Sequence, residues 1–346
     1  MFRRAAMLLF AAVMLSAASV ALAGPGADWA KLLRDGQRHL ERGDAKAAEA
    51  KFSAAIGRAP QRAEAHYQRG VARRQLKQLD AALADFRRAA ELDAKLAEAR
   101  NNIGALLHEK GQLESAERQF VAAVKIKPNY GEAWYNLGLV RFDRRDFAAA
   151  VSAYQRAAAL RPKDPDVLVN WAGALHRLGK RPEALEVLRR AARIAPKDAL
   201  VRANIGQLLA DAGQLAAARA ELEKALELDG GNVKVYQLLA RFWARDGRMD
   251  RAQATLKRGQ RMLPKVAALH CMEGKVLRKL GKAKQAMAAF SRCLALSPPH
   301  QHQRPLLLMA MLEVSSQRCA AAKRLLERAK LAAAVTRRVL APCAKP

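Results

Sequence analysis

Residues 131–164 read GEAWYNLGLVRFDRRDFAAAVSAYQRAAALRPKD, and this stretch decides the fold. Small residues stand at Gly138 and Ala150, and the large Tyr154 follows Ala150 by four positions. Two helices can pack closely only where their side chains are small, and a proline such as Pro162 stops a helix. The stretch therefore predicts a pair of helices in close contact, with Tyr154 filling the space beside that contact.

The same pattern recurs every 34 residues. An alanine series runs without a break through Ala48, Ala82, Ala116, Ala150, Ala184, Ala218, Ala252, Ala286 and Ala320. A second small-residue series consists of Gly36, Gly70, Gly104, Gly138, Ala172, Gly206, Ala240 and Gly274. The large residues of successive copies are Phe52, Phe86, Phe120, Tyr154, Leu188, Leu222, Leu256 and Phe290. Glycines that suit a left-handed turn between the two helices are Gly43, Gly111, Gly179, Gly213, Gly247 and Gly281. One two-helix unit is therefore copied along the chain.

This pattern closely resembles the tetratricopeptide repeat (TPR), a helix-turn-helix unit of 34 residues. The resemblance covers eight repeats without insertion, at 29–62, 63–96, 97–130, 131–164, 165–198, 199–232, 233–266 and 267–300. It implies an all-α, right-handed superhelical solenoid with a concave groove. We expect residues 301–346 to form a degenerate ninth repeat or cap and a tail. Pro305 falls inside its first helix, and Ala320 needs a shift of about two residues to stay in phase.

Residues 1–23 have the composition of a secretory signal peptide. Arg3 and Arg4 precede an apolar run, and Ala21-Leu22-Ala23 is a suitable cleavage site. We expect residues 24–28 to be a short linker and the mature protein to be exported, either periplasmic or secreted. An uncleaved signal anchor is the alternative, because the apolar run is about long enough to span a bilayer.

The resemblance places positions 2, 5, 6, 9, 12 and 13 of each repeat along the concave groove. Position 6 carries an amide row, Gln68, Asn102, Asn136, Asn170 and Asn204. Amide side chains both donate and accept hydrogen bonds, so a regular row suits the backbone of an extended peptide. The row resembles the asparagine ladder of O-linked N-acetylglucosamine transferases, although asparagine is also common at this position in TPR proteins with other roles.

Other groove positions carry aromatic or acidic residues. Tyr67, Tyr135 and Phe142 are expected to add aromatic contacts. Position 2 holds the acidic row Glu64, Glu98, Glu132 and Asp166, which we interpret as helix-start residues that suit the helix dipole, with recognition of a basic ligand as the alternative. No repeat has the lysine at position 5 that the carboxylate clamp of chaperone-binding TPR domains needs.

Positive charge is concentrated in the last third of the chain. The 346 residues carry a formal net charge of +30. Residues 24–232 hold 36 basic and 27 acidic residues, a net of +9, whereas residues 233–346 hold 24 and 5, a net of +19. Basic groove positions there are Lys234, Arg241, Arg245, Lys275, Arg278 and Lys279. They suit an acidic protein, an anionic polysaccharide or lipid head groups, and nucleic acid less well; a merely solvated surface is the alternative.

All four cysteines lie in the last quarter. Two disulfides are allowed, with three connectivities. We expect Cys271 to face the groove, away from Cys293, which makes that pair geometrically poor. Cys319 and Cys343 are the better pair, because their bond would pin the tail to the degenerate repeat.

No catalytic motif, cofactor motif or metal-ligand spacing is present, and His300 and His302 have no acidic or cysteine residue nearby to complete a metal site. The sequence thus predicts a non-catalytic protein that binds a protein or extended peptide in the concave groove. The resemblance to exported TPR proteins of bacteria implies that it acts as a scaffold of the cell envelope. The alternative is a polyanion-binding module that uses the basic third. An accessory subunit of an enzyme is a further alternative.

Overall fold

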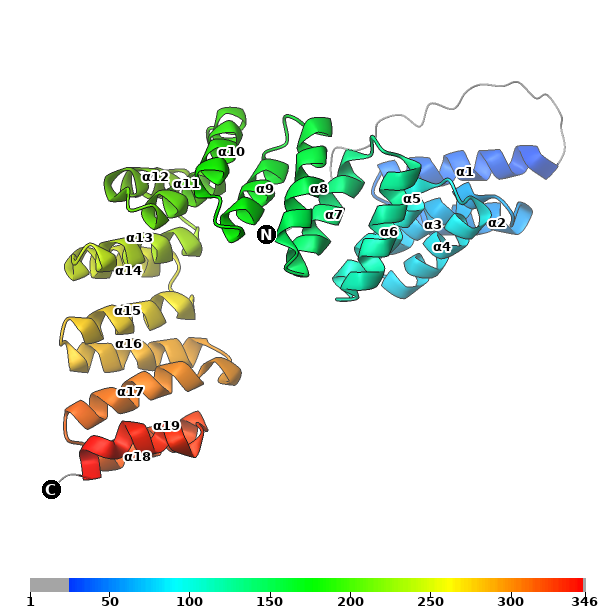
Figure 1. Ribbon diagram of the computed structural model, residues 1–346. Helices are drawn as coiled ribbons and strands as arrows, with labels where there is room; N and C mark the ends of the chain where they lie inside the picture. The colour runs from blue at the N-terminus through cyan, green and yellow to red at the C-terminus, as the bar shows by residue number, and fades with distance from the viewer. Residues whose placement is uncertain (1–24, 345–346) are drawn as a thin grey trace. The chain divides into compact units, whose positions relative to one another are not determined.

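The computed structural model describes residues 25–344, which form α-helices and two short 3-10 turns and contain no strand (Figure 1). The chain divides into two compact units, with the boundary between Asn136 and Leu137. The helices of the first unit are α1 (Pro25–Glu41), α2 (Ala45–Arg58), α3 (Ala63–Gln75), α4 (Leu79–Leu92), α5 (Ala97–Glu109), α6 (Leu113–Ile126) and the first half of α7 (Gly131–Asp143).

The second unit continues the same alternation of first and second helices. Its helices after α7 are α8 (Phe147–Leu160), α9 (Pro165–Arg177), α10 (Arg181–Ile194), α11 (Ala199–Asp211), α12 (Leu215–Leu228), α13 (Val233–Arg245), α14 (Met249–Met262), α15 (Ala267–Lys279), α16 (Ala283–Leu296), α17 (Gln303–Ser315), α18 (Cys319–Ala329) and α19 (Ala333–Leu340), with 3-10 turns η1 (Pro299–Gln301) and η2 (Ala341–Ala344). Within each unit, a first helix packs on the second helix of its own repeat and on that of the repeat before.

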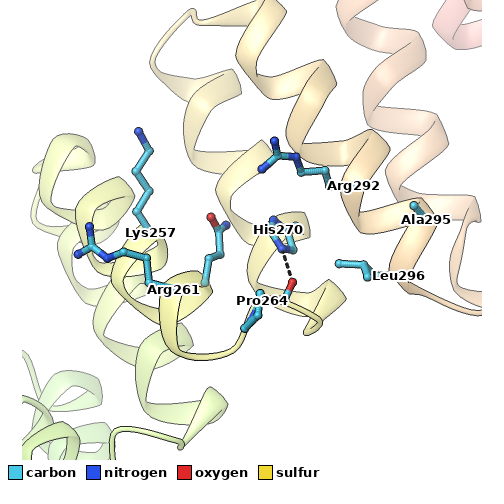
Figure 2. A pocket seen from close by; sticks show the side chains of 8 residues that line it. Lys257, Arg261, Pro264, His270, Arg292, Ala295 and Leu296 are labelled. Carbon is cyan, nitrogen blue, oxygen red and sulfur yellow. Dashed lines mark hydrogen bonds between the residues drawn. The ribbon is translucent and has the colours of Figure 1, made fainter.

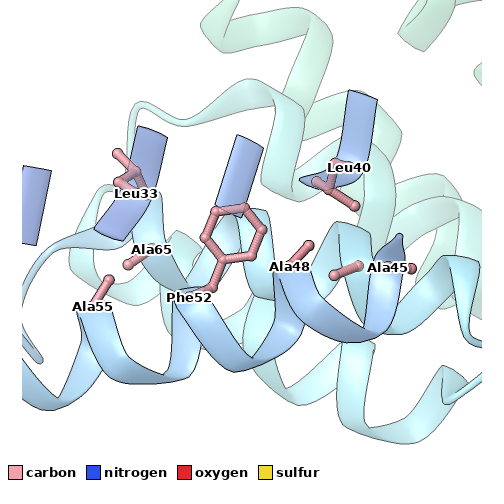
Figure 3. Packing of buried hydrophobic residues seen from close by; sticks show 8 residues of the cluster. Leu33, Leu40, Ala45, Ala48, Phe52, Ala55 and Ala65 are labelled. Carbon is pink, nitrogen blue, oxygen red and sulfur yellow. The ribbon is translucent and has the colours of Figure 1, made fainter. Parts of the chain in front are cut away.

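The two small-residue series lie where the paired helices touch. Figure 3 shows the first repeat, in which Phe52 of α2 lies beneath α1, beside Leu33 and Leu40. A Cβ atom added to Gly36 would lie only 2.5 Å from Cε1 of Phe52, which is fully buried. Glycine is therefore required there because the aromatic ring occupies the space of any side chain.

The turn between the two helices of a repeat needs a left-handed residue. Gly111 has φ +73° at this position, whereas Lys77 has φ +60° at the equivalent position one repeat earlier. A non-glycine residue in this region carries a steric cost of about 1–2 kcal/mol.

Lys77→Gly is expected to stabilise the first unit by about 0.5–1 kcal/mol, because the relief of that strain exceeds the extra entropy glycine loses on folding. A higher midpoint of urea unfolding would confirm this. Gln75→Gly is the matched control, since Gln75 ends α3 with helical geometry and its replacement should lower the midpoint. A fall in both midpoints would contradict the prediction.

The ninth repeat is real but displaced by two residues. The turn η1 follows Pro298, and α17 then begins at Gln303 rather than at residue 301. The 34-residue series predicts a buried alanine at Ala320, but Ala320 is exposed and Ala322 is buried in its place. Leu326 and Ala329 are buried, as the two-residue shift predicts. Pro305 lies in the first turn of α17, where a missing backbone N–H is tolerated.

The N-terminal boundary differs from the expectation. Residues 25–28, expected to belong to a linker, are the first residues of α1, which Pro25 begins. Proline suits this place because its fixed φ matches the first turn of a helix. The expected signal peptide, residues 1–23, lies outside the described residues. Between residues 25 and 344 no helix combines the length and the apolar character needed to cross a membrane.

Candidate functional site

The amide row of the first unit is tied into a hydrogen-bond network. Asn102 is buried; its Nδ2 donates to the carbonyl oxygen of Glu98 at 2.9 Å and to the Tyr67 hydroxyl at 3.4 Å. Its Oδ1 accepts from Nη1 of Arg74 at 2.8 Å. The network thus holds the amide plane of Asn102 in one orientation.

Asn101, a neighbouring asparagine at position 5, is the centre of a second set of hydrogen bonds. Asn136 Nδ2 donates to Oδ1 of Asn101 at 3.0 Å, and Nδ2 of Asn101 donates to the Tyr130 hydroxyl at 3.3 Å and to Oε1 of Glu132 at 3.4 Å. Two other predicted groove residues are half-buried on first helices: Gln68 lies on α3, and Tyr135 lies on α7. The sequence pattern finds Asn136 but does not reveal Asn101 or Tyr130, because their role depends on contacts between successive repeats.

The tyrosine hydroxyl in each of these two sets of hydrogen bonds stays protonated across the physiological pH range. Burial and the nearby carboxylates of Glu98 and Glu132 raise the pKa of Tyr67 to about 12. Burial, followed by Glu132, also raises the pKa of Tyr130. Both hydroxyls therefore remain neutral donors and acceptors beside the amides.

The acidic row at position 2 lies in the first turns of α3, α5, α7 and α9. Glu98 accepts from Nζ of Lys127 at 2.7 Å, so part of its charge is neutralised internally. Burial raises the pKa of Glu64. Burial, together with Asp164 and Asp198, raises the pKa of Asp166. These positions agree with the interpretation as helix-start residues.

In the second unit the amide row continues with Asn170 and Asn204, both half-buried on first helices. Asn170 Nδ2 donates to the carbonyl oxygen of Asp166 at 2.9 Å, the same contact one turn back that Asn102 makes with Glu98. Phe142, expected as a groove aromatic, packs edge-on against Phe147 with ring centroids 5.2 Å apart. Phe142 therefore supports the start of α8.

Beyond Asn204 the chemistry of the first helices changes. Position 6 becomes apolar at Leu238 and Met272. A pocket of about 600 Å³ opens among α13, α15 and α17, lined by Arg241, Lys275 and Lys279 of the predicted basic set and also by Arg304. Its apolar wall includes Phe290, Leu308 and the Cys271–Cys293 disulfide. The basic third thus holds a defined pocket as well as surface charge.

The other predicted basic residues lie outside this pocket lining. Lys234 is exposed in the first turn of α13, and Nη1 of Arg245 donates to the carbonyl oxygen of Ala210 at 3.3 Å. Arg278 is half-buried, and its Nε is enclosed without a hydrogen-bond partner in the described part of the chain. Three of the six predicted basic residues therefore line this pocket, and the other three lie outside its lining.

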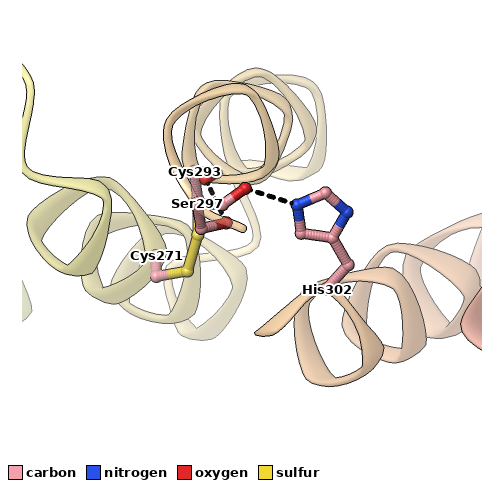
Figure 4. The surroundings of a disulfide bond; sticks show 4 residues. All are labelled: Cys271, Cys293, Ser297 and His302. Atoms are coloured by element: carbon pink, nitrogen blue, oxygen red, sulfur yellow. Dashed lines mark hydrogen bonds between the residues drawn. A yellow bond between two sulfur atoms is a disulfide. The ribbon is translucent and has the colours of Figure 1, made fainter. Parts of the chain in front are cut away.

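All four cysteines are paired. The Cys271–Cys293 bond, with Cα atoms 5.1 Å apart, contradicts the expectation that this pair is geometrically poor. Figure 4 shows why: Cys271 of α15 points toward α16, and Cys293 meets it there. Position 5 borders the contact between the paired helices as well as the groove. The second bond joins Cys319 to Cys343, with Cα atoms 5.9 Å apart, and ties η2 to the start of α18.

Histidines at the starts of first helices have structural contacts. His270 Nε2 lies 3.0 Å from the carbonyl oxygen of Pro264 (Figure 2). His66 Nε2 lies at the same distance from the carbonyl oxygen of Pro60. His302 Nε2 lies 2.8 Å from the carbonyl oxygen of Ser297 (Figure 4). Within residues 25–344 no cluster of three metal-ligating side chains is found.

A second basic pocket lies on the side of the second helices. It has a volume of about 610 Å³ and lies among α14, α15 and α16. Figure 2 shows Lys257 and Arg261 on one side of it and Arg292 and Leu296 on the other. Gln260 beside it donates to the buried carboxylate of Glu273 at 2.8 Å. This pocket has nearly the same volume as the pocket among α13, α15 and α17 and is also lined by basic side chains, so substitutions in it can serve as controls.

The geometry defines a protein built from tandem helix-pair repeats. Family models described as tetratricopeptide repeat match residues 141–208 and 209–270, 101–165 and 267–300, and a model described as TPR repeat matches residues 72–111. The chain belongs to the tetratricopeptide repeat family.

Solved structures show the same fold. The Pseudomonas aeruginosa protein pilF is 21% identical over 63% of this chain and 99% of its own, with a TM-score of 0.56. A tetratricopeptide repeat protein from Parabacteroides merdae is 19% identical over 73% of this chain and 100% of its own, with a TM-score of 0.55. No curated protein matches the sequence.

Proposed function

We propose that this protein is a non-catalytic scaffold of the cell envelope that binds an extended segment of a partner protein along the faces of its first helices. Tetratricopeptide repeats are protein-interaction modules, and a solenoid of this kind offers each repeat as one contact unit. The single observation that carries the proposal is the amide row, which places an amide at position 6 in five successive repeats.

The row has the chemistry that backbone recognition needs. Asn136 and Asn170 are half-buried, so a bound segment can reach them, and each is oriented by an internal hydrogen bond. An oriented amide loses little entropy when it binds. Because backbone groups are the same in every peptide, such a row would tolerate many partner sequences.

Two features support an exported location. Residues 1–23 have the composition of a secretory signal peptide. The two disulfides of the last quarter are typical of proteins that fold in an oxidising compartment. A secreted location and a retained signal anchor are the alternatives to a periplasmic one.

Asn136→Ala and Asn170→Ala together are expected to weaken partner binding about tenfold, because each removes hydrogen bonds worth about 0.5–1.5 kcal/mol. The measurement is retention of a discrete protein from an envelope extract at physiological salt, followed by titration of that protein. Gln155→Ala is the matched control, since Gln155 is an exposed amide on a second helix. Unchanged affinity at unchanged helicity would exclude the amide row as the binding site.

An anionic partner held by the basic third is a second candidate, favoured by the convergence of Arg241, Lys275 and Lys279 in one pocket. Binding through charge alone would weaken steeply with added salt. Retention of acidic material only at low salt, unaffected by the asparagine variants, would favour this candidate.

A further inference from the structure

The pocket among α13, α15 and α17 collects positive charge without its counterions. Within the described chain, none of Arg241, Lys275, Lys279 and Arg304 forms an ion pair, and no carboxylate lines the pocket. Nearby acids are engaged elsewhere: Glu313 pairs with Arg318, and Glu273 accepts from Gln260. No carboxylate in the pocket lining therefore balances the charge of these four side chains.

Lys275 is held in an environment that opposes its charge. It is half-buried, and burial, followed by Arg304 and Arg241, lowers its pKa. A bound anion would remove this penalty, since an opposite charge within a few ångströms favours the charged form. The same arrangement without a ligand gives the fold no ion-pair stabilisation.

The pocket also offers an apolar surface beside the cations. Met272 and Leu308, both half-buried, present apolar groups to it, and the Cys271–Cys293 disulfide forms part of the wall. Phe290 lies fully buried behind this lining and supports it. A ligand that is only a polyanion, such as an acidic polysaccharide, would leave this surface unused. A volume of about 600 Å³ lies within the usual range for a site that encloses a small ligand or a few side chains.

Amides at the rim suit a peptide in particular. Gln237 of α13 and Gln301 of η1 line the pocket, and each can donate to a backbone carbonyl and accept from a backbone N–H. The charge, the apolar wall and the amides together match a peptide with acidic residues next to an apolar residue.

We propose that this pocket binds an acidic segment of a partner protein, in which carboxylates contact Arg241, Lys275, Lys279 and Arg304 while a neighbouring aromatic or aliphatic side chain enters against Met272 and Leu308. The proposal rests on the protein's function as an interaction scaffold and adds a second, chemically distinct contact to the amide row. Its specificity comes from requiring charge and apolar surface at once.

The test is calorimetric titration of the full chain at physiological salt with four probes. The peptide acetyl-DEFDLE-amide is expected to bind with one site per chain. The neutral peptide acetyl-NQFNLQ-amide and the acidic peptide acetyl-DEGDGE-amide, which lacks apolar side chains, are each expected to bind at least about tenfold more weakly. Dodecanoate tests for a free amphiphilic carboxylate and is expected not to compete.

Arg241→Glu with Lys279→Glu is expected to weaken binding of acetyl-DEFDLE-amide by about tenfold or more. Both residues are exposed, so the fold should tolerate the change. Lys257→Glu with Arg261→Glu is the matched control, because it makes the same change in net charge at the pocket on the second-helix side. The control should alter affinity less than about threefold, as expected for screened charges at a distance.

Four outcomes would overturn the proposal. These are no binding of acetyl-DEFDLE-amide, equal binding of acetyl-DEGDGE-amide, displacement by dodecanoate, and equal loss of affinity in the two pairs of variants. If the peptide fails to bind while an envelope partner is still retained and still depends on Asn136 and Asn170, the scaffold function stands and only the acidic-segment site is excluded.

Discussion

Asp85→Ala is expected to destabilise the first unit by about 3 kcal/mol, because the substitution leaves the partly buried guanidinium group of Arg69 without its counterion and removes one of the two carboxylates paired with Arg73. The side chain of Asp85 is 5% exposed. It accepts from Nη2 of Arg69 at 2.7 Å, from Nε of Arg69 at 2.9 Å and from Nη1 of Arg73 at 2.9 Å. Arg73 also donates from Nε to Glu49 at 2.8 Å, so the network joins α2, α3 and α4.

Asp80→Ala is the matched control on the same helix. Asp80 pairs with Lys110, but its side chain is 92% exposed, and exposed ion pairs contribute little to stability because solvent screens them. Urea unfolding followed by circular dichroism measures both variants. Equal losses of stability would show that burial of the Asp85 network adds nothing.

Gly138→Ala is expected to destabilise the second unit by about 2 kcal/mol through overpacking. A Cβ atom at residue 138 would lie 2.5 Å from Cδ1 and Cε1 of Tyr154, a ring that is 1% exposed. Gly173→Ala, one repeat later in α9, should instead stabilise by about 0.5–1 kcal/mol, because no atom outside the helix lies within 4 Å of the added group.

The repeats themselves suggest the compensating change. Where the glycine is replaced by alanine, at Ala172 and Ala240, the facing residues are Leu188 and Leu256 rather than an aromatic residue. The double variant Gly138→Ala with Tyr154→Leu should therefore recover most of the stability lost by the single variants. The coupling between the two sites in a double-mutant cycle measures this, and additive losses would contradict it.

The repeat architecture was predictable because the same pair of contacting residues recurs in each copy of the repeat. A small residue facing a large one at a fixed interval specifies which helices pair, and the structure places Gly138 against Tyr154 accordingly. The two-residue displacement of the ninth repeat was also visible in the phase of Leu326 and Ala329.

The basic pocket was predictable only in part. Arg241, Lys275 and Lys279 follow from their repeat positions, whereas Arg304 was missed. Arg304 takes position 2 only because the two-residue displacement makes Gln303 the first residue of α17. Applying this displacement to the groove positions of the ninth repeat would have identified Arg304. The Cys271–Cys293 bond was missed because a position number does not say which way a side chain leans between two helices.

The hydrogen bonds that the amide row makes within the protein could not be predicted from the sequence of one repeat. Asn136 contacts Asn101, and Asn102 contacts Tyr67, over separations of about one repeat. Periodicity identifies the equivalent positions, but the partner of each amide depends on how two successive copies stack.

The placement of the two disulfides gives the array a direction of unravelling. Repeat arrays lose structure from their ends, because a terminal repeat has only one neighbour. Both covalent links lie after Leu269, one within the eighth repeat and one that ties η2 to α18. In an oxidising compartment these cross-links are expected to slow the fraying of the last two repeats, whereas the repeats before α15 carry no such link. Under reducing conditions both ends become free to fray, and the last repeats lose their protection from proteases.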